Sequence, residues 1–192
     1  MPNVTWLEPQ ILLDLLALNI YAAENNLPVP GEPRAAVVSP WLSDVEIELG
    51  PSVWHQYLNI GRTNVPLRIG DALVRLRRAG WAVDIAVLQY GQSSCGLTKR
   101  SQDFAHEVTL LKRCFAERIR IRLCPNLHAK GIVTPLGVIT GGTNYTRSGL
   151  YLQSQNSNYF AHDHAEYASN RGQLLSYCDC VEPIISVASL EG

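Results

Sequence analysis

The chain of 192 residues is long enough to bury the core of one domain, and we expect a single domain over residues 1–192. Its hydrophobic fraction of 46% and the absence of low-complexity runs exclude an intrinsically disordered chain. The net charge of -1, the lack of an apolar run of membrane-span length and the lack of a signal-peptide pattern favour a cytoplasmic protein over a membrane-bound or exported one.

The first predicted element is an amphipathic helix over residues 9–26, because apolar residues recur there at helical spacing and Asn-Asn marks the end. This helix forms most of an N-terminal segment that we place at residues 1–30. A buried strand is predicted over residues 35–39 (AAVVS), and it leads into a Pro-containing turn. Beyond this turn, Ser43 or Asp44 is expected to begin a short helical or irregular segment.

The middle of the chain alternates helical patterns with β-branched runs. Gly80 is expected to terminate one helix, and Ser101 is the expected N-cap of the next. The predicted elements are a helix over 65–80, a strand over 81–91, a helix over 101–117 and a strand over 118–124. This order, followed by a hairpin, predicts an α/β layer fold with a largely buried sheet.

The net charge conceals an uneven distribution along the chain. Residues 1–60 hold one basic and seven acidic residues, residues 61–130 hold thirteen and five, and residues 131–192 hold two and five. The middle block therefore carries +8 (thirteen minus five), between blocks of -6 and -3. Such a block either attracts a polyanion or forms solvated helix faces, and the sequence leaves both interpretations open.

One stretch, residues 126–149 (NLHAKGIVTPLGVITGGTNYTRSG), holds residue types suited to binding a phosphate. His128 and Lys130 are two residues apart, so in an extended segment they project to the same face. A β-hairpin is predicted directly after them, with Pro135 and Gly137 in its turn.

The predicted hairpin leads to Gly141 and Gly142, where the backbone can approach a ligand closely. Thr143 or Asn144 is expected to cap a following helix, whose free N–H groups suit an anion. An imidazole, an ammonium, a carboxamide and a helix N-terminus would then meet at one phosphate. The imidazole can attack phosphorus covalently, while the ammonium and the carboxamide neutralise and orient the phosphoryl oxygens.

This pattern resembles the signature of the phospholipase D superfamily, in which HxK is followed by GSxN. The residues that carry the likeness are His128, Lys130, Gly141, Gly142 and Asn144. The run TNYTRSGL is similar to the residues after that signature in many members, and the whole resemblance spans roughly residues 35–168. The chain departs from the pattern at Pro135, where the family has Asp, at Gly142, where it has Ser, and in a hairpin one residue shorter.

The resemblance implies a fold, a reaction and partners. The fold is an α/β, phospholipase D-like domain whose mixed β-sheet is flanked by helices on both faces. The reaction is phosphodiester hydrolysis without a metal or another cofactor, in which one His forms a phosphohistidine and a second His protonates the leaving oxygen. Because the chain has one motif, a symmetric homodimer would bring two His128 side chains together. Small single-motif members usually cleave nucleic acid, and DNA is the expected substrate.

The resemblance also implies the residues of the site. The catalytic residues are then His128, Lys130, Asn144 and Glu166, and the substrate-binding residues are Gly141, Gly142 and Thr143. Glu166 would accept a hydrogen bond from His128 and fix its tautomer, as the Asp does in a serine-hydrolase triad. A structural or surface role for Glu166 is an open alternative.

Two further groups of residues have side chains of the kinds that bind metals. His162, His164 and Glu166 alternate, so on a strand they would share one face. Cys178 and Cys180 lack the usual spacing of a zinc knuckle, and we expect no metal site. The cysteines form an odd, scattered set typical of a reducing cytoplasm: Cys95, Cys114, Cys124, Cys178 and Cys180.

Three functions are compatible with the sequence. The leading one is a homodimeric, metal-independent nuclease acting on DNA. The second is a nucleic-acid-binding or assembly subunit with little or no catalysis, working with other proteins of a DNA-modification or defence system, and Pro135 and Gly142 motivate it. The third is a phospholipid phosphodiesterase, but no basic amphipathic helix indicates a lipid anchor, and no membrane partner is expected.

Overall fold

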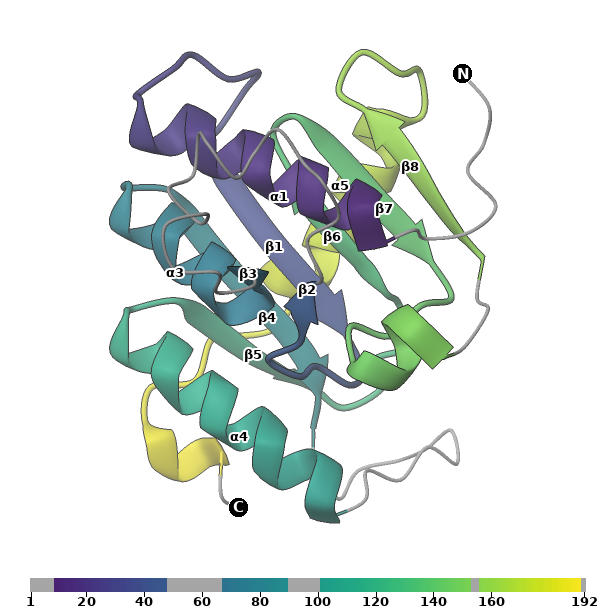
Figure 1. Cartoon of the computed structure of the whole chain (residues 1–192). Helices are drawn as coiled ribbons and strands as arrows, with labels where there is room; N and C mark the ends of the chain where they lie inside the picture. The colour runs from purple at the N-terminus through teal and green to yellow at the C-terminus, as the bar shows by residue number, and fades with distance from the viewer. Residues whose placement is uncertain (1–8, 48–66, 90–100, 153–155, 191–192) are drawn as a thin grey trace.

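A six-stranded sheet in the order β5-β4-β1-β6-β7-β8 forms the centre of the protein (Figure 1). The computed structural model describes residues 9–47, 67–89, 101–152 and 156–190. The six strands are β1 (Arg34–Ser39), β4 (Ala82–Leu88), β5 (Arg120–Cys124), β6 (Gly131–Thr134), β7 (Gly137–Gly141) and β8 (Ser157–Ala161). β1, β4 and β5 are parallel, whereas β6 pairs with β1 in the antiparallel sense, as do β7 with β6 and β8 with β7. The sheet is therefore mixed, as expected.

Helices cover both faces of this sheet, which confirms the expected layers. One face carries three helices, α1 (Pro9–Glu24), α3 (Ile69–Arg78) and α4 (Ser101–Ala116), and we call it the three-helix face. The opposite face carries α5 (Tyr167–Asp179), and we call it the α5 face (Figure 1). The shorter elements are β2 (Glu46–Ile47), β3 (Leu67–Arg68), η2 (Ser148–Leu152) and η3 (Val187–Leu190). In the described parts of the chain, no helix has both the length and the apolar character needed to cross a bilayer.

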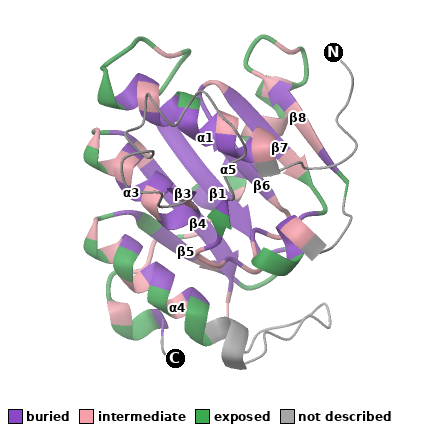
Figure 2. Ribbon diagram, viewed as in Figure 1, coloured by how far each residue is buried: buried purple, intermediate pink, exposed green. Residues whose placement is uncertain are grey.

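Alternate strand positions supply two hydrophobic cores, one on each face. Val37 and Ile85 pack under the three-helix face, while their neighbours Ala36 and Ala86 pack under α5. Figure 2 shows the buried strands between helices whose outer sides are exposed. The strands are thus covered on both sides, which explains their continuous apolar runs.

The helices and strands predicted up to the hairpin are found close to their expected positions. The helix after Leu67 ends as expected, because Gly80 follows the C-cap residue Ala79 with a φ of 92° and its N–H donates to the carbonyl of Arg77. The last two residues of the predicted strand 81–91, the side chain of Ser101 and Cys95 lie outside the described residues.

Two segments have a structure that the local sequence pattern does not predict clearly. After Ser43 the described chain is irregular and then enters β2, and Asp44 accepts a hydrogen bond from the Gly70 N–H (2.9 Å) in the first turn of α3. The helix α5 was not predicted at all. Its sequence contains Gly172 and buries few side chains, Leu174, Leu175 and Cys178, so the apolar periodicity that indicates a helix is weak there.

A buried carboxylate ties the parallel strands to α5. Asp84 on β4 is fully buried and pairs with Arg34 of β1 (2.8 Å) and Arg120 of β5 (2.7 Å). Arg122 of β5 bonds the second oxygen of the same carboxylate, and Arg34 also reaches Asp179 at the end of α5 (2.6 Å). These charges neutralise one another in a region with little solvent, so loss of one partner leaves the others uncompensated.

Asp84→Asn is therefore expected to lower the free energy of unfolding by about 3–5 kcal/mol. Urea denaturation measures it. The control is Arg78→Ala, which removes a pair with Glu117 in which the Arg78 side chain is 68% exposed, and it should leave the midpoint close to wild type. A loss in Asp84→Asn no larger than in the control would show that the buried network does not stabilise the fold.

Candidate active site

His128 and Lys130 lie at the end of the sheet that is formed by the carboxyl ends of the parallel strands. β6 runs against β1, with Gly131 paired to Val38 near the C-terminal end of β1. His128 and Lys130 directly precede β6, so the chain delivers both to this edge. The carboxyl ends of β1, β4 and β5 meet here, a position where open α/β sheets commonly bind ligands.

His128 and Lys130 project away from the α5 face. Leu127 is fully buried in the α5-side core and Ala129 packs against it, whereas His128 and Lys130 are not part of that core. His128 is exposed and Lys130 is half-buried. The Lys130 Nζ donates to the carbonyl of His128 (3.1 Å), and burial lowers the pKa of the Lys130 ammonium.

Gly141 joins the His128–Lys130 segment to the segment around Asn144 through a backbone hydrogen bond. Its N–H donates to the carbonyl of Lys130 (3.2 Å), and the N–H of Gly142 donates to the carbonyl of Asn156 (2.8 Å). A Cβ on Gly141 would lie 2.4 Å from the Asn156 oxygen, so the close approach of the two backbones requires glycine. Both N–H groups are thus bonded to protein carbonyls.

The prediction that Thr143 or Asn144 caps a helix is wrong. Tyr145 forms a bridge to Leu42, and its side chain is 1% exposed. Helical backbone begins at Arg147 and continues as the π-type segment η2, Ser148–Leu152. The cap is Thr146, whose hydroxyl accepts from the Gly149 N–H (3.1 Å) and whose carbonyl accepts from the Leu150 N–H (2.9 Å). The buried Tyr145 thus separates Asn144 from the helix cap.

Asn144 itself sits in a closely packed position. Its Oδ1 is buried and has no hydrogen-bond partner among the described residues. The preceding Thr143 is held by a buried hydrogen bond from the hydroxyl of Ser157 on β8 (3.0 Å). A Cβ on Gly149 would lie 2.1 Å from the carbonyl oxygen of Asn144. Ser157 was not anticipated, because only the β7–β8 pairing brings it beside the motif.

The implied bond between Glu166 and His128 is not present within one subunit. β8 ends at Ala161, which pairs with Gly137 at the turn of the hairpin. Glu166 follows this end and is exposed, whereas His128 precedes the opposite end of β6. The direction of β8 therefore places the Glu166 carboxylate and the His128 imidazole at opposite ends of the hairpin.

The alternating His162, His164 and Glu166 are not on a strand. They lie in the turns between β8 and α5, where the rule that alternate residues share a face does not apply. Among the described residues no three His, Cys, Asp or Glu side chains are grouped as metal ligands. Cys178 is buried, which raises the pKa of its thiol to about 12, while Cys180 is exposed, so the two do not act together.

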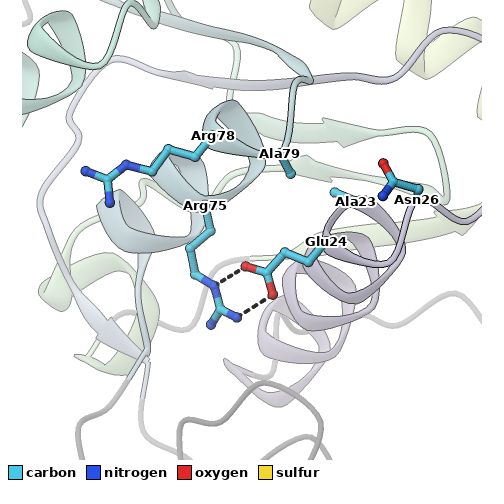
Figure 3. Close-up of a pocket in the computed structure, with 6 residues that line it drawn as sticks. All are labelled: Ala23, Glu24, Asn26, Arg75, Arg78 and Ala79. Carbon is cyan, nitrogen blue, oxygen red and sulfur yellow. Dashed lines mark hydrogen bonds and ion pairs between the residues drawn. The ribbon is translucent and has the colours of Figure 1, made fainter.

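Several described basic residues of the positive middle block, residues 61–130, pair with acidic residues of the protein itself. Arg75 lines a hollow of about 550 Å³ together with Glu24, and the two form a pair with two 2.7 Å bonds (Figure 3). Arg78 points away from that pair and bonds Glu117. The hollow lies where α1 and α3 end, near the start of β1 and β4, remote from His128. These arginines fit the interpretation as solvated, paired helix faces.

Gly141→Ala is expected to lower the free energy of unfolding by about 1–3 kcal/mol, because the new methyl group is forced against Asn156. The matched control is Gly172→Ala in α5, where nothing lies within 4 Å of the added Cβ. That change should raise the free energy of unfolding by about 0.5–1 kcal/mol. Urea denaturation compares the two, and a similar effect of both would contradict a close backbone contact at Gly141.

Comparison with known proteins gives a likeness in fold. No family model and no curated protein sequence matches the chain significantly. Nuc from Salmonella typhimurium, a phospholipase D family member, has a TM-score of 0.56 and 16% identity over 91% of both chains. NucT from Helicobacter pylori has a TM-score of 0.52 and 10% identity over 92% of both. Phosphatidylserine synthase from Haemophilus influenzae has a TM-score of 0.53 and 12% identity over 94% of this chain and 38% of that one. The chain therefore has the fold of the phospholipase D family.

Proposed function

We propose that the protein is a metal-independent phosphodiesterase that cleaves DNA through a phosphohistidine on His128. The observation that carries this proposal is the placement of His128 and Lys130 together at the carboxyl edge of the sheet. The bond from the Gly141 N–H to the Lys130 carbonyl brings the second half of the motif to the same place. The phospholipase D-like fold supports the same chemistry.

In the proposed reaction, an unprotonated nitrogen of His128 attacks phosphorus. The N–P bond forms as the P–O bond to the leaving nucleoside oxygen breaks, and the imidazolium of a second His128 donates its proton to that oxygen. This second imidazole then takes a proton from water, whose oxygen attacks phosphorus and releases the first His128. The exposed position of His128 leaves room for a polymer to approach.

Lys130 and Asn144 are assigned to the phosphate. Burial disfavours the charged form of Lys130, as its lowered pKa shows, and an anion bound beside it would favour the charged form again. A buried acceptor without a donor costs about 1–3 kcal/mol. The Asn144 Oδ1 is such an acceptor, and a hydroxyl of the substrate or an imidazole N–H would satisfy it.

The second histidine is assigned to another copy of the chain. Among the described residues, no side chain forms a hydrogen bond with the His128 imidazole. Because the sequence holds one His-x-Lys motif, we assign the acid that protonates the leaving oxygen to a second copy of the chain. A two-fold symmetric homodimer would supply the equivalent His128 from the partner copy.

The same observation supports a second candidate, a nucleic-acid-binding subunit without catalysis. An imidazole with no bonded partner is not held in one tautomer or orientation, which weakens it as a nucleophile. Pro135 and Gly142, where the family signature has Asp and Ser, point in the same direction.

His128→Ala is expected to reduce cleavage of a labelled DNA strand by roughly 10³-fold or more, since both the nucleophile and the general acid are lost. The assay is run in EDTA. His162→Ala, an exposed histidine beyond β8, is the control and should keep wild-type activity. Equal rates in wild type and His128→Ala would overturn the mechanism, and binding of DNA without cleavage by the wild type would favour the second candidate.

Mixing subunits tests whether the site is shared. If each site needs His128 from both copies, an exchanged equal mixture of wild-type and His128→Ala subunits contains about one quarter of fully wild-type dimers. Its activity should then be about one quarter of the pure wild type at the same total concentration. Retention of about half would show that each subunit acts alone.

Lys130→Arg tests the charge beside the phosphate. Because cleavage requires the protonated amine, kcat/KM of the wild type should fall as the pH rises through the pKa of Lys130, which lies below its ordinary value of 10.5. Arginine stays protonated over this range, so the variant should lose the alkaline decline although its rate at neutral pH is lower. Profiles of kcat/KM against pH measure this, and an unchanged decline in the variant would remove Lys130 from the assignment.

A further inference from the structure

A polar hollow of about 310 Å³ lies next to the candidate active site. Its lining residues are Ser43, Asp44, Val45, Glu46, Arg68, Arg147 and Tyr151. The N–H of Ser43 donates to the carbonyl of Tyr145 (2.9 Å), the residue directly after Asn144. Val45 belongs to the core of the three-helix face, so one wall of the hollow is formed on that side of the sheet.

One cation in this lining has no acidic partner within the described residues. Arg68 pairs with Glu46, and the Asp44 carboxylate accepts from the Gly70 N–H (2.9 Å) and from Arg113 (3.2 Å). Arg147 is exposed and forms no ion pair within the described part of the chain. Its guanidinium is thus available to an anion, three residues after Asn144.

The rest of the lining suits a nucleobase better than a second phosphate. Tyr151 is half-buried, and its hydroxyl is anchored to the carbonyl of Glu46 (3.1 Å). Paired carboxylates and guanidiniums offer acceptors and donors with almost no net charge, which matches the edge of a base. An aromatic ring provides a surface on which an unstacked base can lie.

We propose that this hollow binds the nucleotide next to the scissile phosphate of a single DNA strand. Arg147 contacts the phosphate of that nucleotide, and its base lies in the hollow against Tyr151. The inference takes from the proposed function only the identity of the ligand, a DNA strand, and its test does not require cleavage.

The test is the salt dependence of binding to a fluorescein-labelled single strand of about 12 nucleotides, followed by fluorescence anisotropy. His128→Ala protein is used so that the strand stays intact. Adding Arg147→Ala is expected to weaken binding and to reduce the magnitude of the slope of log K against log salt by about 0.7, the value for one phosphate contact on a single strand. Arg147→Lys should restore most of the slope.

Two control variants distinguish binding in the hollow from nonspecific attraction of the strand to positive charge. Arg118→Ala removes an exposed arginine near the opposite edge of the sheet, between α4 and β5, and should leave the slope unchanged. Tyr151→Ala should weaken binding about fivefold or more with the slope unchanged, whereas Tyr151→Phe should bind nearly as well as the parent.

An unchanged slope in Arg147→Ala would overturn the inference, as would failure of the His128→Ala protein to bind the single strand. These results are distinguishable from failure of the proposed function. If the slope falls as expected but the wild type cleaves no DNA, the hollow remains a nucleotide-binding site and the nuclease proposal is wrong. If the wild type cleaves DNA in a His128-dependent manner but Arg147→Ala leaves the slope unchanged, the nuclease proposal stands and the role of the hollow in nucleotide binding is wrong.

Discussion

The antiparallel pairing of β6 with β1 is the constraint on which the candidate site depends. The parallel strands β1, β4 and β5 end at one edge, and β6, which runs the other way, has to begin there. The segment that leads into β6 therefore presents His128 and Lys130 beside the carboxyl ends of three strands. At the other ends of these strands, Asp84 joins arginines of β1 and β5. The charged network and the candidate site thus occupy opposite ends of the same strands.

Electrostatics distinguishes these two ends. The arginines around Asp84 neutralise a buried carboxylate, and Arg75 and Arg78 of α3 pair with glutamates at the surface. Several described cations of the positive block are in this way paired with acidic residues of the protein itself. Two of the described cations stand beside the motif, where Lys130 has a lowered pKa and Arg147 lacks an acidic partner among the described residues. A few local cations, rather than the total charge of a block, then determine where a polyanion is held.

Contacts between distant segments decide where the helix cap and Glu166 lie relative to the motif. Thr143 and Asn144 have the composition of a helix start, but Tyr145 is buried and forms a bridge to Leu42, and the helical turn is capped by Thr146 instead. Glu166 stands at a plausible distance along the chain from the motif, yet the direction of β8 places it at the far end of the hairpin from His128. In both cases a long-range contact overrides a local preference.

The sequence by itself determined most of the elements, and it supplied the residue types of the motif. The period of the apolar residues predicted α1, β1, α3, β4, α4 and β5, and the spacing of His128 and Lys130 predicted a shared side. Only the tertiary structure decided which residues meet there, because strand order and direction depend on pairings between distant segments. Those pairings place Ser157 near the motif and Glu166 away from it, and no local pattern records them.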